Sequence, residues 1–140
     1  MWIVYALLTV LSYAFMDFFV KKAAGRIDDA LGAALINIFS VLPPMIWFIS
    51  SRLTNKDVIA AKEGYLFAAL AGVAIGFGSI FFIKMFATGT NLSIGVPLVR
   101  IGIVLLAVAI GALVLKESLS VKQLFGLALS VVGLYLVIAK

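Results

Sequence analysis

Residues 64–83 read GYLFAALAGVAIGFGSIFFI, a run of twenty residues without one charged side chain. The hydrocarbon core of a bilayer is about 30 Å thick, and a helix needs roughly 20 mostly apolar residues to cross it. Two comparable runs precede this stretch and two follow it. The sequence therefore predicts five membrane-crossing helices, over residues 2–20, 30–51, 64–87, 92–115 and 119–139.

The composition of the whole chain agrees with that prediction. Of its 140 residues, 65% are hydrophobic and 12% are charged, with a mean hydropathy of +1.26. A soluble domain is closer to half apolar and a quarter charged. None of the runs alternates apolar with polar residues as a β-barrel strand does. We predict an all-α transmembrane fold, a five-helix membrane bundle forming a single domain over residues 1–140.

Residue usage also narrows the possible chemistry. The chain has no cysteine and no histidine, which excludes thiol chemistry, disulfides and Cys/His metal sites. No nucleophile–base pair and no metal-ligand cluster is visible, so we expect no enzyme, no metal and no cofactor. The net charge of +5 comes from basic residues that lie mostly at the ends of apolar runs. Lipid headgroups and topology explain them better than nucleic acid does.

Local signals mark several helix ends. Ser120 and Gln123 have the spacing of a capping box, so the last helix is expected to begin near Ser120. Asp28 or Asp29 can cap the second helix. The turn at 88–91 is so short that the helices on either side are expected to form a tight antiparallel hairpin. Pro43 and Pro44 predict a kink in the second helix.

An odd number of crossings places the two ends of the chain on opposite sides of the membrane. Basic loops favour the cytoplasmic side. Here one side carries five basic residues and the other carries four, which is almost no bias. The balance fits either a weakly determined single orientation or dual topology, in which copies insert both ways. The first group is Arg52, Lys56, Lys62, Lys116 and Lys122, and the second is Lys21, Lys22, Arg26 and Lys140.

The last third of the chain carries a family-like pattern. It consists of the triplet 96–98 (VPL) early in one helix, the turn 115–119 (LKESL), and Gly126 and Gly133 in the last helix. This pattern resembles the end of an EamA domain of the drug/metabolite transporter superfamily, and the rest of the chain matches that domain in helix number and layout. Most members have two such domains in one chain, so a single domain implies dimerisation.

The resemblance implies a multi-pass carrier of small metabolites or drugs in the plasma or inner membrane. Many secondary transporters consist of two repeats of inverted topology with the substrate site between them. By this resemblance, the chain is expected to be one half of such an inverted-repeat transporter. We expect a secondary-active exporter working by alternating access as an antiparallel homodimer in the lipid bilayer. The alternative is a structural subunit, or half of a heterodimer.

Three ionisable side chains lie inside the predicted spans, namely Asp17, Lys84 and Arg100. Such groups are costly in a membrane and are functional candidates by default. All three fall in the same half of the membrane, so they could form one cluster. Arg100 is the strongest candidate for substrate binding, with structural pairing to Asp17 as its alternative. Lys84 is the weakest, because its long side chain can reach the headgroups.

Other residues complete the predicted site. Polar faces on the first, second and fourth helices either line a cavity or form hydrogen bonds between helices, and glycines at a spacing of four favour close helix packing. Prolines within spans can act as hinges. The cavity candidates are Thr9, Ser12, Tyr13, Asn37, Ser40 and Ser93; the hinge candidates are Pro43, Pro44 and Pro97; the packing or dimer candidates are Gly72, Gly76, Gly126, Ser130 and Gly133.

The charge of the cluster bears on the substrate. Asp17 beside two cations would stay ionised, which makes it a poor proton relay. We therefore expect anionic, zwitterionic or neutral substrates rather than lipophilic cations.

Overall fold

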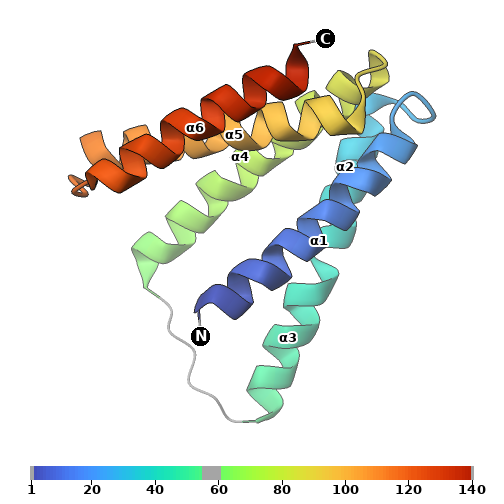
Figure 1. The fold of residues 1–140 in the computed structure, drawn as a ribbon. Coiled ribbons are helices and arrows are strands. Elements are labelled where there is room, and N and C mark those ends of the chain that lie inside the picture. Colours follow the sequence, from blue (N-terminus) through green and yellow to red (C-terminus); the bar gives the residue numbers. More distant parts are fainter. Residues whose placement is uncertain (1, 55–60, 140) are drawn as a thin grey trace. The chain divides into compact units, whose positions relative to one another are not determined.

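The structure, a computed structural model, describes residues 2–54 and 61–139. All regular elements in these ranges are helices, and Figure 1 shows them in chain order. Five stretches are long and apolar enough to cross a membrane, the second of them formed by α2 and α3 together. The all-α transmembrane prediction is confirmed. The bounds are α1 (Trp2–Ala23), α2 (Asp29–Ser40), α3 (Leu42–Leu53), α4 (Lys62–Ala87), α5 (Leu92–Leu113) and α6 (Val121–Ile138).

The predicted caps form. The Asp28 carboxylate accepts hydrogen bonds at 3.0 Å from the backbone N–H groups of Ala30 and Leu31, so Asp28 is the residue that caps α2. Ser120 caps α6, and its reciprocal bonds with Gln123 complete the capping box. Each cap satisfies N–H groups that the first turn of a helix leaves without an internal partner.

The chain divides into two compact units, residues 1–89 and 90–140. In the first unit, α1 runs antiparallel to α2 and α3, and α4 packs against α2 and α1 (Figure 1). A tight turn joins α1 to α2. Gly25 adopts a φ of +73° in that turn, a conformation that costs residues with a Cβ but not glycine.

The core of the first unit lies where the end of α1, the start of α2 and the end of α4 meet. Val20, Ala33, Ile83 and Phe86 are buried there, and Ile83 is fully inaccessible. Gly32 allows the close approach of α2 to α4, because a Cβ on it would lie 3.1 Å from Cδ1 of Ile83. This end of the unit is therefore the tightly packed one.

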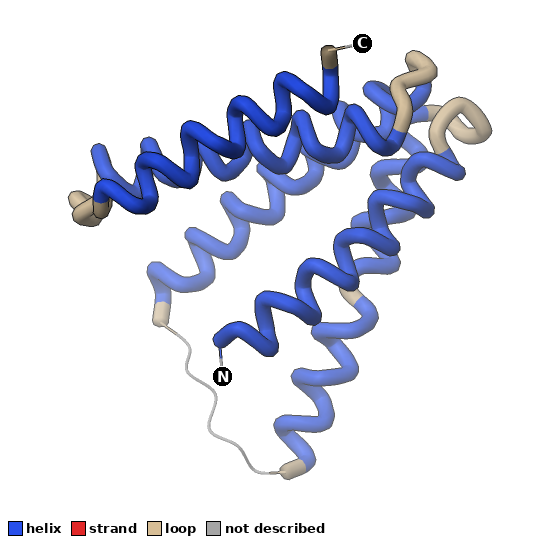
Figure 2. Tube along the Cα trace, in the orientation of Figure 1, coloured by secondary structure: helices blue, strands red, loops and turns tan. Residues whose placement is uncertain are grey.

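The second crossing is two helices rather than one. The helix expected over residues 30–51 is interrupted at Val41, where α2 ends and α3 begins, as the short loop segment in Figure 2 shows. Proline has no N–H, and its ring clashes with the carbonyl four residues earlier, so two successive prolines cannot continue a helix. Pro43 and Pro44 instead lie in the first turn of α3, where helices accept proline. The predicted kink is confirmed as a break.

The second unit is an antiparallel pair of helices, α5 and α6, that pack side by side (Figure 1). The prediction that the fourth span continues to Leu115 is wrong by two residues, since α5 ends at Leu113. The chain turns because Lys116 takes a left-handed conformation with a φ of +54°. Glu117 then donates its backbone N–H to the carbonyl of Gly111 at 3.0 Å, which closes the end of the helix.

Other bounds shift by a few residues, and α1 extends to Ala23. Lys56 and Lys140 of the charge count lie outside the described residues. The turn before α5 has the expected length, and Gly89 supplies its positive φ of +93°. Packing of α4 and α5 as a hairpin stays a prediction.

Candidate functional site

Asp17 is the buried charged residue of the first unit. It lies six residues before the end of α1, and 4% of its surface is exposed. An acidic side chain near the end of a span can be solvated at the membrane interface, but the burial of Asp17 argues against this. A carboxylate at this depth must be met by polar groups. No buried side-chain oxygen or nitrogen in the described ranges lacks a hydrogen-bond partner.

Two lysines follow Asp17 at the end of α1, each over an aromatic ring. The ammonium of Lys21 lies 5.4 Å from the ring centroid of Phe86 on α4. The ammonium of Lys22 lies 5.7 Å from the ring of Phe18 on its own helix. Cations over ring faces gain electrostatic attraction, and their stems cover apolar surface. These contacts anchor the end of α1 beside the core formed with α4.

Arg100 lies on α5 in the second unit and is half-buried. Ser93 and Pro97 share its helix face, and the same face continues to Gly111. Gly111 is buried, since the Glu117 side chain folds over it and Oε2 would lie 2.7 Å from a Cβ there. From the sequence, Glu117 was recognised only as part of the turn 115–119, and its position over Gly111 was missed. Because Asp17 and Arg100 belong to different units, their pairing stays a prediction.

The small polar side chains of the spans bond to their own helices. In a membrane, these bonds satisfy the hydroxyl groups and one N–H of the Asn37 amide without a partner on a second helix. The oxygen atoms remain able to accept further bonds, which leaves a cavity role open for them. The bonds run from Thr9 to the Tyr5 carbonyl (2.8 Å), Ser12 to Leu8 (2.9 Å), Asn37 to Ala33 (2.7 Å), Ser40 to Asn37 (2.8 Å), and Ser130 to Gly126 (2.9 Å).

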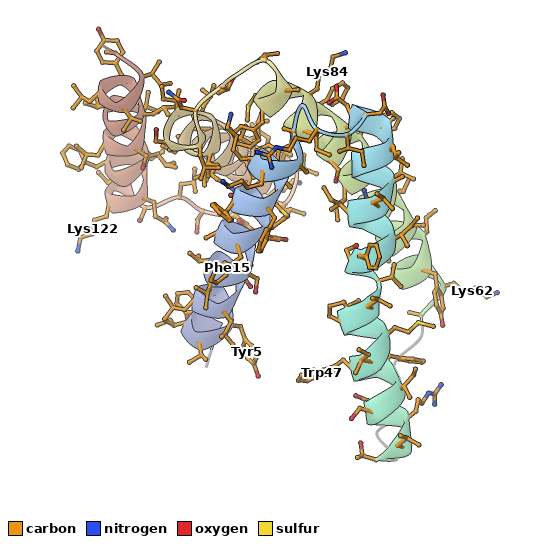
Figure 3. All side chains as sticks on the ribbon, turned by 90° about the vertical axis from the view of Figure 1, so that its right-hand side faces the viewer. Tyr5, Phe15, Trp47, Lys62, Lys84 and Lys122 are labelled. Carbon is orange, nitrogen blue, oxygen red and sulfur yellow. The ribbon has the colours of Figure 1, made fainter. Side chains whose placement is uncertain are left out.

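Lys84 is exposed on α4, and its side chain points away from the helix near the end of that span (Figure 3). Lys62, also directed outward, marks the other end of α4 (Figure 3). This placement favours the interpretation that the Lys84 side chain reaches the lipid headgroups. No three acidic residues lie together in the described ranges.

The glycines divide into two groups. A Cβ at Gly32 or Gly111 would meet an atom closer than 3.2 Å, so these two glycines serve contacts within the chain. The predicted packing glycines behave differently. At Gly72, Gly76, Gly126 and Gly133, nothing in the described part of the chain comes within 4 Å of a Cβ. The role of these four glycines in packing or in a dimer stays a prediction.

Comparison with known proteins supports a transport role. Neither the search of curated proteins nor that of solved structures found a significant match. The model of the EamA-like transporter family matches residues 1–139. That match covers all five candidate spans and both units. This multi-pass membrane chain belongs to the EamA-like transporter family, within the drug/metabolite transporter superfamily.

Proposed function

We propose that the chain is a secondary-active exporter of small metabolites or drugs that works as an antiparallel homodimer by alternating access. The observation that carries this proposal is the match of one family model across five spans. Because the number of crossings is odd, a second copy inserted the other way supplies the second, inverted repeat. Carriers of this kind bind substrate between their two repeats.

Two features support the second copy. The basic residues divide five to four between the two sides, which is compatible with insertion in both orientations. The glycines at 72, 76, 126 and 133 present open, small-residue surfaces on α4 and α6. Small residues let helix backbones approach closely, which is how membrane helices of separate chains associate.

Arg100 is the residue that we propose for substrate recognition, and Asp17 is a second, separate candidate for contact with the substrate. A half-buried guanidinium inside a span suits a carboxylate or another anionic group, because its planar donors match that geometry. The proposed substrates are therefore anionic, zwitterionic or neutral. The proposed location is the plasma or inner membrane, with no cofactor and no nucleic-acid partner.

The test is transport by the purified chain alone. We expect proteoliposomes that contain only this chain to take up or release labelled solutes from a panel of organic anions, zwitterions and neutral metabolites. Arg100→Gln proteoliposomes serve as the matched negative control. Robust membrane insertion without transport of any panel member would favour the second candidate, a structural subunit or half of a heterodimer.

A further inference from the structure

The break between α2 and α3 leaves the Ser40 main-chain carbonyl without a donor from its own helix. In a continuous helix the Ser40 carbonyl accepts a hydrogen bond from residue 44, or from residue 43 in a tighter turn. Both positions are proline, which has no N–H. The next N–H, on Met45, donates to the Val41 carbonyl at 3.0 Å. The Ser40 carbonyl therefore has two vacant lone pairs as far as its own helix is concerned.

This carbonyl lies next to the centre of the second candidate span, which would place it near the middle of the membrane. The second span covers Asp29–Leu53, 25 residues, and Val41 is its central residue. Ser40 and the four residues after it are exposed on the described chain. Hydrocarbon offers no hydrogen-bond donor, so open backbone at this depth is tolerated only against protein or a water-filled cavity. The break must therefore face one of these two rather than lipid.

Neighbouring groups at the break add acceptors, together with the second N–H of the Asn37 amide. The Ser40 hydroxyl donates to the Asn37 carbonyl at 2.8 Å, and the Asn37 amide nitrogen donates to the Ala33 carbonyl at 2.7 Å. The side-chain oxygens of both residues stay able to accept. The C-terminal end of α2 also carries partial negative charge. A group that binds here is thus one that donates hydrogen bonds.

We propose that the α2–α3 break lines the substrate pathway, and that the Ser40 carbonyl accepts a hydrogen bond from an amine or hydroxyl group of the transported molecule. In other carriers, the unpaired carbonyls of interrupted helices coordinate the coupling ions, which shows that such carbonyls can act as ligands near the middle of the membrane. The substrates are then those anionic, zwitterionic or neutral molecules that carry an amine or hydroxyl group, a narrower class than the one named above. This proposal rests on the transport function, which it refines.

The first experiment tests access from water. The chain has no native cysteine, so single cysteines can be compared cleanly. Ser40→Cys is set against Leu11→Cys and Val132→Cys, two exposed positions within α1 and α6 that lie away from the predicted polar and glycine faces. The probe is a charged, water-soluble methanethiosulfonate. Because it reacts with the thiolate, which forms in water and not in hydrocarbon, we expect Ser40→Cys to react at least about tenfold faster than both controls.

The second experiment tests the carbonyl itself. Pro44→Ala returns an N–H at the position that bonds the Ser40 carbonyl, whereas the matched variant Pro43→Ala returns one for the Phe39 carbonyl. With a solute that the wild-type proteoliposomes transport, we expect Pro44→Ala to raise KM at least about tenfold, and Pro43→Ala less than about threefold. A hinge role for the prolines would instead lower the maximal rate in both variants.

The outcomes separate this proposal from the transport proposal. If Ser40→Cys reacts as slowly as the controls, the proposal for the α2–α3 break is overturned, even if the chain transports solutes. Disulfide cross-linking of Ser40→Cys between copies would then show that a second copy of the chain covers the break. An unchanged KM in Pro44→Ala also overturns it. Absence of transport in the wild type, with fast Ser40→Cys labelling, would refute the transport function and leave the water-accessible break in place.

Discussion

Glu117 closes the end of α5 onto Gly111 in two ways. Its backbone N–H donates to the Gly111 carbonyl at 3.0 Å, and its carboxylate covers the bare Cα of the same glycine. The LKESL turn that resembles the EamA pattern therefore has a structural role, because it stops α5 and starts the return into α6. Five residues of sequence separate the two partners, so the contact is local to the second unit.

The first prediction concerns Gly111→Ala. The new methyl group would lie 2.7 Å from Oε2 of Glu117, which must move. Because that oxygen ends a flexible side chain, we expect a loss of about 1 kcal/mol or less in the free energy of unfolding. Sodium dodecyl sulfate titration in mild detergent measures it. Adding Glu117→Ala should remove the clash, so the double variant should lose less free energy of unfolding than the sum of the two single losses. A loss equal to that sum, or larger, would contradict the contact.

A second prediction concerns the left-handed residue in the same turn. Lys116 has a φ of +54°, which costs a residue with a Cβ about 1 kcal/mol relative to glycine. We expect Lys116→Gly to raise the free energy of unfolding by about that amount, and Lys116→Val to lower it. Thermal unfolding in detergent compares the variants. Equal melting temperatures for the glycine and valine variants would show that the turn does not hold this conformation.

Packing of α2 on α4 supplies the third prediction. A methyl group at Gly32 would lie 3.1 Å from both Ile27 and the fully buried Ile83, so Gly32→Ala should destabilise the first unit by about 1–3 kcal/mol. Gly76→Ala on α4 is the matched control, because nothing in the described chain meets a Cβ there. In a monomeric detergent preparation, the control should unfold like the wild type.

The fourth prediction tests orientation. Arg26 in the α1–α2 turn and Lys122 at the start of α6 are both exposed, and five crossings place them on opposite sides of the membrane. We expect a membrane-impermeant maleimide added outside intact cells to label Arg26→Cys and Lys122→Cys each in about half of the molecules. Complete labelling of one variant and none of the other would mean a fixed orientation, and the antiparallel homodimer would fail.

The fifth prediction separates the charged residues of the spans. If Arg100 binds the substrate, Arg100→Gln should reduce transport by at least about tenfold, while Arg100→Lys retains part of it. Lys84→Gln is the matched control, because Lys84 is exposed and points away from α4 (Figure 3). Initial uptake rates in proteoliposomes, corrected for protein content, provide the measurement. Equal losses at both positions would indicate a general charge effect instead.

The amino-acid sequence by itself determined the number, type and approximate bounds of the spans. This succeeds because a bilayer imposes one length and one polarity on each crossing, and both are visible as uncharged runs such as residues 64–83. Caps at Asp28 and Ser120 were equally predictable, since a cap depends on side chains within three residues of each other.

Tertiary structure decided which small and polar residues are enclosed. Gly32 and Gly72 look alike as sequence, yet only Gly32 is covered, because the approach of Ile83 depends on how α4 crosses α2. Asp17 is likewise buried by the packing around it. From the sequence alone, its position near the end of a span was also compatible with solvation at the membrane interface. Span length and capping depend on residues close together in the sequence, so they could be predicted. Burial depends on side chains far apart in the chain, so it could not.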